Sequence, residues 1–200
     1  STIPLLLRLM ELCPISDPEV EKLLIQIRLS TLNHLSNDHI SFSSLPFYEA
    51  LALHCFTNEY VFLESNEETL KIDQLENEIS MCISSKEHIS VLKITLLATY
   101  RPLHIFSWAE KLLESDSADT LQKIIIRQIT EVREEHRLRS QISEINVTEN
   151  KISQIVREQY EESPYPRWVN LGLSFEPKTI REVMKDLRVN LDLNENKFST

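Results

Sequence analysis

Gly172 is the only glycine in this chain. Glycine reaches positive backbone φ angles without steric cost, and tight hairpin turns and phosphate-binding loops depend on it. A Rossmann fingerprint or a P-loop needs more than one glycine, so the sequence excludes both. A β-sandwich or barrel with many tight turns is disfavoured for the same reason. The sequence therefore predicts an all-helical chain with Asn, Asp, Ser and Pro in its loops.

The chain carries a formal net charge of −10, with 42% hydrophobic and 26% charged residues. This balance is typical of a folded domain, and it disfavours general binding of nucleic-acid phosphates, which needs clustered Lys and Arg. There is no apolar run of membrane-spanning length, and the start at Ser1 has neither an initiator Met nor the basic region of a signal peptide. The missing Met suggests a trimmed fragment. Cys13, Cys55 and Cys82 are expected to be buried thiols in a reducing cytoplasm.

Caps followed by apolar residues at helical spacing predict helices along most of the chain. They are expected at 18–34, at 45–62, from Asn66, from Ser85, from Pro102, from Asp116 or Ser117, from Thr148 and after Pro177. The 45–62 segment is apolar almost all round, which predicts a central buried helix. The mixed charges after Val132 indicate a solvated face with i,i+4 pairs.

The expected architecture is all-α, with about nine helices packed as antiparallel helical hairpins or as a degenerate helical-repeat stack. We expect residues 1–175 to form the helical domain. Residues 176–200 are expected to form an amphipathic helix and a linker. Inward residues of the 18–34 helix are expected to include Leu23 and Leu24.

Catalytic signatures are weak, so we assign no catalytic and no metal-binding residue. His54 stands beside Cys55, but neighbours on a helix point about 100° apart, which favours a core histidine over a nucleophile–base pair. The acidic residues Glu67 and Glu68 fit the first turn of a helix, where they complement its dipole. The alternative is an enzyme in which His54, Glu59 and Arg167 meet in a cleft.

Two prolines near the C-terminal end bracket a tyrosine and precede an arginine and a tryptophan, in the order Pro164, Tyr165, Pro166, Arg167, Trp168. Proline fixes its own φ and pushes the preceding residue into an extended conformation, which predicts a stiff strap. Tyr, Trp and Arg are frequent binding anchors. The strap is either a helix terminator that fills a core groove or a platform that docks a ligand or another domain.

Two stretches resemble a known family. Residues 152–168, ISQIVREQYEESPYPRW, and residues 50–62, ALALHCFTNEYVF, are similar to motifs of bacterial proteins that join tetratricopeptide repeats to a class I S-adenosylmethionine-dependent methyltransferase. The resemblance covers most of residues 10–190. It implies a helical region between the repeats and a catalytic domain, which would begin with a strand and a Gly-rich turn beyond Thr200.

The resemblance implies a methyltransferase parent, with no S-adenosylmethionine site in this chain. The expected function is a non-catalytic accessory domain that braces the catalytic domain in cis or presents a protein substrate to it. The alternative is a stand-alone protein–protein interaction or dimerisation domain, with the apolar helix at 3–12 and exposed Leu5, Leu6 and Leu9 as the dimer face. The candidate interface residues are Asn58, Glu59, Tyr60, Tyr160, Glu161, Pro164, Tyr165, Pro166, Arg167 and Trp168.

Overall fold

The computed structural model describes residues 4–35, 44–141 and 178–186, and every regular element in these residues is a helix. The predicted all-α class is confirmed, and the eight α-helices of the described residues are close to the expected number. The chain divides into two compact units, Ser1–Val169 and Asn170–Thr200. Each unit is described by itself.

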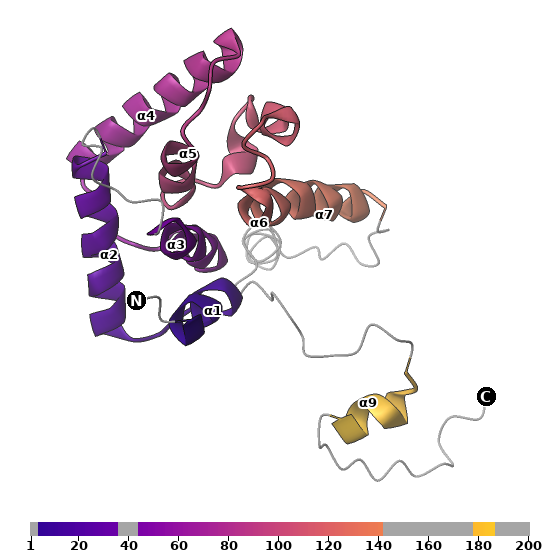
Figure 1. Cartoon of the computed structure of the whole chain (residues 1–200). Coiled ribbons are helices and arrows are strands. Elements are labelled where there is room, and N and C mark those ends of the chain that lie inside the picture. Colours follow the sequence, from indigo (N-terminus) through magenta and orange to yellow (C-terminus); the bar gives the residue numbers. More distant parts are fainter. Residues whose placement is uncertain (1–3, 36–43, 142–177, 187–200) are drawn as a thin grey trace, which may run out of the picture. The chain divides into compact units, whose positions relative to one another are not determined.

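The described residues of the first unit form seven α-helices and three short helical turns, and Figure 1 shows how the α-helices are arranged. They are α1 (Pro4–Leu12), α2 (Pro18–Asn33), α3 (Leu45–Thr57), α4 (Asn66–Ser85), α5 (Val91–Ala98), the 3₁₀ turns η2 (Leu103–Ile105) and η3 (Ala109–Glu114), α6 (Gln122–Ile125), the π-helical turn η4 (Ile126–Thr130) and α7 (Glu131–Arg139). The elements α6, η4 and α7 follow one another without a break, so residues 122–139 form one long helix with a π turn inside it.

Helix α3 is the centre of the first unit, in contact with α1, α5 and α6 (Figure 1). Every residue from Ala50 to Thr57 is buried. Leu53 belongs to a large apolar cluster with α4 and α5, whereas Leu51 belongs to a second cluster with α1 and α2. The prediction of a central buried helix is therefore confirmed. The helix ends at Thr57, however, and the expected extension to residue 62 is wrong.

The region after Pro102 also differs from the expected α-helix. It forms two 3₁₀ turns, between which Phe106 takes an extended conformation. There the Phe106 ring stacks on Trp108 at 4.9 Å, and the indole nitrogen of Trp108 donates a hydrogen bond of 2.8 Å to Glu76 on α4. These tertiary contacts outweigh the local helix signal. The next helix begins at Gln122, so neither Asp116 nor Ser117 caps it.

Smaller corrections concern caps and burial. Ser65, rather than Asn66, caps α4, and α5 follows Ser90 rather than Ser85. Leu23 lies on the exposed side of α2, and Cys13 is exposed, so only Cys55 of the three cysteines is fully buried.

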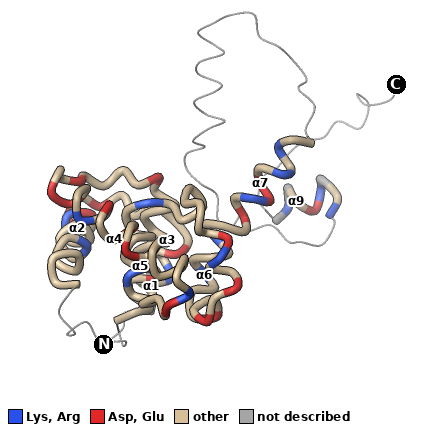
Figure 2. Tube along the Cα trace, turned by 90° about the horizontal axis from the view of Figure 1, so that it is seen from above, with Lys and Arg blue, Asp and Glu red and all other residues tan. Residues whose placement is uncertain are grey.

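Acidic and basic positions interleave along α7 as expected (Figure 2), with ion pairs between Arg127 and Glu131 and between Glu134 and Arg137.

Gln128 on the π turn is fully buried and connects three elements. Its Oε1 accepts the Leu103 N–H at 3.1 Å, and its Nε2 donates to the carbonyls of Ala52 at 3.2 Å and Ala98 at 3.3 Å. The Leu103 N–H begins η2 and the Ala98 carbonyl ends α5, where backbone groups lack a partner within their own helix, whereas the Ala52 carbonyl lies inside α3. Gln128 therefore holds the long helix against α3 and against the end of α5.

The described part of the second unit is α9 (Ile180–Asp186). Thr179 and Glu182 form a reciprocal cap, in which the Glu182 N–H donates to Thr179 Oγ1 at 3.3 Å and the Thr179 N–H donates to Glu182 Oε2 at 2.8 Å. This agrees with the helix predicted after Pro177. The helix predicted from Thr148 lies outside the described residues, and the 175/176 boundary stays a prediction.

Candidate functional site

The candidate residues Asn58, Glu59 and Tyr60 form the exit from α3. The Tyr60 N–H donates to the Cys55 carbonyl at 2.9 Å and the Glu59 N–H donates to the Phe56 carbonyl at 3.2 Å. This is the Schellman pattern that commonly ends helices at a glycine. Here Glu59 and Tyr60 adopt positive φ angles of 52° and 54° instead. Such backbone costs free energy in a non-glycine residue and persists only where the surroundings enforce it.

The chain then runs to α4 with alternating burial. Val61 is 58% exposed, Phe62 is buried, and Leu63 is 82% exposed. Two large apolar side chains therefore face outward within three residues. Isolated exposed apolar residues are ordinary, but a pair on a short connection offers a compact contact area. We call residues 58–65 the 58–65 loop.

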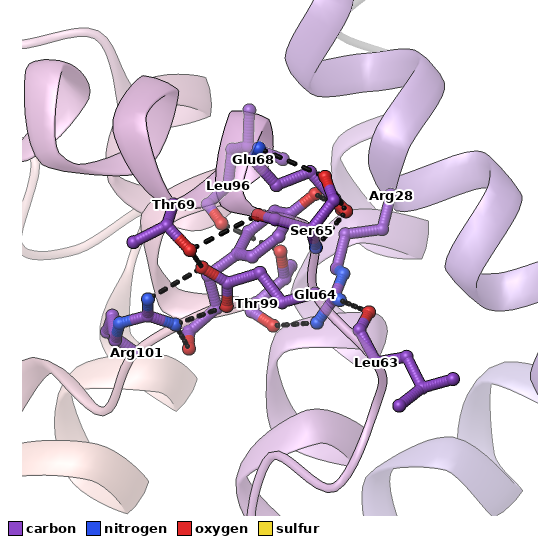
Figure 3. Close-up of polar contacts among 10 residues, drawn as sticks. Arg28, Leu63, Glu64, Ser65, Glu68, Thr69, Leu96, Thr99 and Arg101 are labelled. Atoms are coloured by element: carbon purple, nitrogen blue, oxygen red, sulfur yellow. Dashed lines mark hydrogen bonds and ion pairs between the residues drawn. The ribbon is translucent and has the colours of Figure 1, made fainter.

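Arg28 of α2 holds this loop from inside the protein (Figure 3). Its side chain is only 1% exposed, and its Nη2 donates to the Leu63 carbonyl at 3.0 Å while its Nη1 donates to the Thr99 carbonyl at 3.3 Å. The guanidinium lies 4.0 Å from the centre of the Tyr100 ring and 5.5 Å from that of Phe62. Carbonyls and aromatic faces thus replace water around the buried cation.

Glu64 fixes the next position of the loop. Its two carboxylate oxygens accept hydrogen bonds from both terminal nitrogens of Arg101, at 2.6 Å and 2.7 Å, and Oε1 also accepts from Thr69 at 2.7 Å. The Arg101 hydrogen bonds hold the pKa of Glu64 below its usual range. A bidentate contact restrains both partners more than a single ion pair does, so the loop is tied to the end of α5.

The last residue of the loop, Ser65, is the N-cap of α4 in a capping box with Glu68. The Glu68 carboxylate is buried and its Oε1 also accepts the Tyr100 hydroxyl at 3.0 Å. Burial raises the pKa of that hydroxyl, so Tyr100 remains a donor near neutral pH. Earlier in the loop, the Tyr60 hydroxyl donates to the Ala98 carbonyl at 3.1 Å.

Residues of α2, of α4, and of the end of α5 and the segment after it therefore hold the loop at Tyr60, Leu63, Glu64 and Ser65. The two exposed apolar side chains are carried on a backbone with restrained positions. In Figure 3 the Leu63 side chain points away from the polar network that binds its carbonyl group. Preorganised surfaces lose little conformational entropy when they bind. This arrangement suits a docking surface.

The remaining predicted interface residues lie outside the described residues. They are Tyr160, Glu161, Pro164, Tyr165, Pro166, Arg167 and Trp168. Of the ten candidates, the structure describes the three at the exit of α3.

His54 and Cys55 do not form a reactive pair. Both side chains are buried in α3, where burial raises the pKa of the Cys55 thiol to about 12. Burial lowers the pKa of His54, against a hydrogen bond with the Cys13 backbone. The Nδ1 atom of His54 has no hydrogen-bond partner. A neutral thiol in the core is a poor nucleophile, which agrees with the expected core role.

The described residues hold no cluster of His, Cys, Asp and Glu that could bind a metal ion. Within the same residues, no helix combines the length and the apolarity that crossing a membrane requires. The S-adenosylmethionine site that the resemblance implies for a parent protein needs a strand leading into a Gly-rich turn. The described residues hold no such strand and turn, because their regular elements are helical and the single glycine lies outside them.

Comparison with known proteins finds no family model, no curated protein and no solved structure that matches this chain.

The sequence analysis missed Arg28, which is central to the site. A signal existed, because Arg28 lies four residues from both Leu24 and Leu32, on the stripe of α2 that faces the core. A charged residue on an apolar stripe is seldom buried without partners. The sequence alone could not name those partners, since the Leu63 and Thr99 carbonyls lie 35 and 71 residues away.

Proposed function

We propose that this chain is a non-catalytic helical interaction domain whose 58–65 loop docks another protein domain. One observation carries the proposal: a backbone that a buried arginine holds by a hydrogen bond to the Leu63 carbonyl displays Val61 and Leu63 to solvent. The side chains of the His54–Cys55 pair are both in the core, which also favours binding over chemistry in this region.

The partner we propose is the catalytic domain of a class I S-adenosylmethionine-dependent methyltransferase in the same polypeptide. The support is the resemblance of residues 50–62 and 152–168 to motifs that precede such a domain. The first of these stretches ends within the 58–65 loop. The domain would brace the catalytic domain or present a protein substrate to it.

The first test is the sequence of the encoding gene beyond Thr200. A coding sequence for a strand and a Gly-rich turn is expected there, and a stop codon directly after Thr200 would remove the partner in cis. The encoded methyltransferase domain can then be titrated with this chain by isothermal calorimetry.

The titration compares Val61→Glu/Leu63→Glu with Leu70→Glu/Met81→Glu, which alters two apolar side chains of α4 that are 64% and 71% exposed. Burial of one leucine contributes about 1.5–3 kcal/mol, so the loop variant should bind more than about tenfold more weakly. The α4 variant should bind as the unchanged chain does. Equal affinity of the loop variant and the unchanged chain would contradict the proposed surface.

The second candidate is a stand-alone interaction or dimerisation domain with no link to a methyltransferase. It is favoured by exposed leucines on α1, although only two of the three expected ones are exposed. Leu5 and Leu9 face solvent, but Leu6 is partly buried against the second apolar cluster. A stop codon after Thr200, together with concentration-dependent light scattering, would select this candidate.

A further inference from the structure

His54 lies in the last turn of α3 and contacts the 58–65 loop from inside the protein. Its side chain is buried, and its ring centre lies 5.8 Å from that of Phe62, the buried apolar side chain of the loop. The ring also forms a hydrogen bond with the Cys13 backbone. Because Nδ1 has no hydrogen-bond partner, this bond belongs to Nε2. The site therefore suits a neutral ring.

A protonated His54 does not suit the same site. Protonation adds an N–H group at Nδ1, and a buried donor without an acceptor is costly, more so when it carries a charge. The guanidinium of Arg28 lies 5.5 Å from the centre of the Phe62 ring, so two cations would then lie beside one ring. The end of a helix favours a cation, but burial outweighs this effect and lowers the pKa of His54.

No carboxylate of the described residues is among the groups that shift the pKa of His54. The neighbouring Cys55 thiol is neutral, since burial raises its pKa to about 12. Charged side chains on the elements around α3 pair with one another: Arg8 with Glu11, Lys123 with Glu11 and Glu49, Lys93 with Glu78, and Arg101 with Glu64. A positive charge on His54 would therefore stay uncompensated.

The loop is the part of these surroundings that can give way. The hydrogen bond with the Cys13 backbone favours the protonated ring, so acid strengthens that contact. Phe62 offers no hydrogen bond in return. The loop backbone also carries the cost of positive φ at Glu59 and Tyr60, which its release would relieve. Helix α3, by contrast, packs between two apolar clusters.

We infer that protonation of His54 moves Phe62 out of the core and releases the 58–65 loop, which makes the docking surface sensitive to pH. As regulation of docking this rests on the proposed function, whereas the release itself does not. Below pH 6.5 an exposed His54 binds a proton that the buried one resists, so acid favours opening of the loop. The opening equilibrium should grow about tenfold between about pH 7.5 and about pH 5.5.

Amide hydrogen exchange of the whole chain, followed by NMR and divided by the intrinsic rate at each pH, tests this inference. The Glu59, Tyr60 and Val61 amides, which donate to carbonyls at the end of α3, should lose protection about tenfold over that pH range. His54→Gln keeps an N–H donor but does not titrate, so it should show no such loss. Dilute urea should barely change exchange in the loop, since a local opening exposes little surface.

The matched control is His34→Gln, which removes the exposed histidine at the end of α2, where Nδ1 lies 2.8 Å from the Ser30 carbonyl oxygen. This variant should lose loop protection in acid as the unchanged chain does. A second measurement needs no variant: the Leu63 methyl signals of the unchanged chain should shift with the same pH midpoint as the His54 ring signals.

Four results would each overturn the inference. They are loop protection that does not change with pH, an equal loss in His54→Gln, loop exchange with the same urea dependence as α5, and a different midpoint for Leu63. None of these measurements uses a partner domain. Failure of the pH response is therefore distinguishable from failure of the proposed docking.

Discussion

The Nη2 atom of Arg28 donates a hydrogen bond of 3.0 Å to the carbonyl oxygen of Leu63, and that residue's side chain is the most exposed of the large apolar side chains in the described residues. A buried cation on α2 thus fixes the backbone beneath an exposed leucine. The restrained backbone makes the exposed side chain better suited to binding, because an exposed leucine contributes most to binding when its backbone is already in place.

Arg28→Met should lower the free energy of unfolding by about 1–3 kcal/mol, because the Leu63 and Thr99 carbonyls lose their donors. Methionine fills a similar volume, so the loss is smaller than for a cavity-forming alanine. Urea denaturation measures the change. Hydrogen exchange should also accelerate for amides of the 58–65 loop. Unchanged exchange in that loop would mean that Arg28 does not hold it.

Glu64→Gln should reduce stability by about 1 kcal/mol at pH 7, the usual scale of a well-formed, partly exposed ion pair. Because Arg101 lowers the pKa of Glu64 below 4.5, the pair stabilises the fold above pH 4.5 and loses that effect as the pH falls through the folded-state pKa. Urea denaturation from pH 7 to pH 3 should therefore show the two proteins converging in acid.

The control for this series is Glu67→Gln, which removes an exposed carboxylate paired with Lys71. Glu67→Gln should lower the free energy of unfolding less than Glu64→Gln does, and this difference from the unchanged chain should vanish at high salt. A constant difference between Glu64→Gln and the unchanged chain across the whole pH range would show that the Glu64–Arg101 contact adds no charge-dependent stability.

His54→Leu should remove part of the acid sensitivity of the fold. Burial lowers the pKa of His54 below its ordinary value of 6.5, so below that pH the unfolded chain binds a proton that the folded chain resists. Stability of the unchanged chain should fall as the pH drops below 6.5, and the variant should show a shallower fall. Thermal unfolding monitored by circular dichroism measures both slopes. Identical slopes would show that His54 becomes protonated without cost in the folded protein.

Local signals in the sequence predicted much of the fold. Asp17 and Pro18 begin α2 as expected, since Asp17 accepts the N–H groups of Glu19 and Val20 at 2.9 Å and 3.0 Å. The all-round apolar composition of α3 correctly indicated a central buried helix, and the structure places that helix between two apolar clusters. Signals of this kind depend on a few neighbouring residues, which is why they could be found without a structure.

Two effects explain the errors: a helix end that no residue type marks in the sequence, and contacts between residues far apart in the chain. Val61 and Phe62 continue an apolar run, so the end of α3 was placed too late. Helix α3 ends where Glu59 and Tyr60 adopt positive φ angles, and the sequence has no glycine at these positions that would indicate a helix end. Trp108 likewise leaves the expected helix to reach Glu76, 32 residues earlier. The candidate site depends on both the unmarked end of α3 and a long-range contact. Sequence reasoning therefore found the first three residues of the loop but not Arg28, which lies 35 residues from Leu63.

The scarcity of glycine leads to a further prediction at the end of α4. Lys86 occupies the left-handed position there, with φ of 56°, and the Glu87 N–H donates to the Cys82 carbonyl at 2.9 Å in the same pattern as at the end of α3. The left-handed conformation costs a residue with a Cβ atom about 1–2 kcal/mol, and glycine avoids this cost. Glycine makes the unfolded chain more flexible, however, so its greater loss of entropy on folding costs about 0.5–1 kcal/mol.

Lys86→Gly should therefore raise the free energy of unfolding by about 0.5–1 kcal/mol, in contrast to the usual effect of introducing glycine. Lys86→Ala is the matched control, since it removes the same exposed charge but keeps the Cβ atom, and it should leave stability nearly unchanged. Urea denaturation of the three proteins decides the matter. If the glycine variant is no more stable than the alanine variant, the left-handed backbone at Lys86 carries no cost, and the end of α4 is not strained by the lack of glycine.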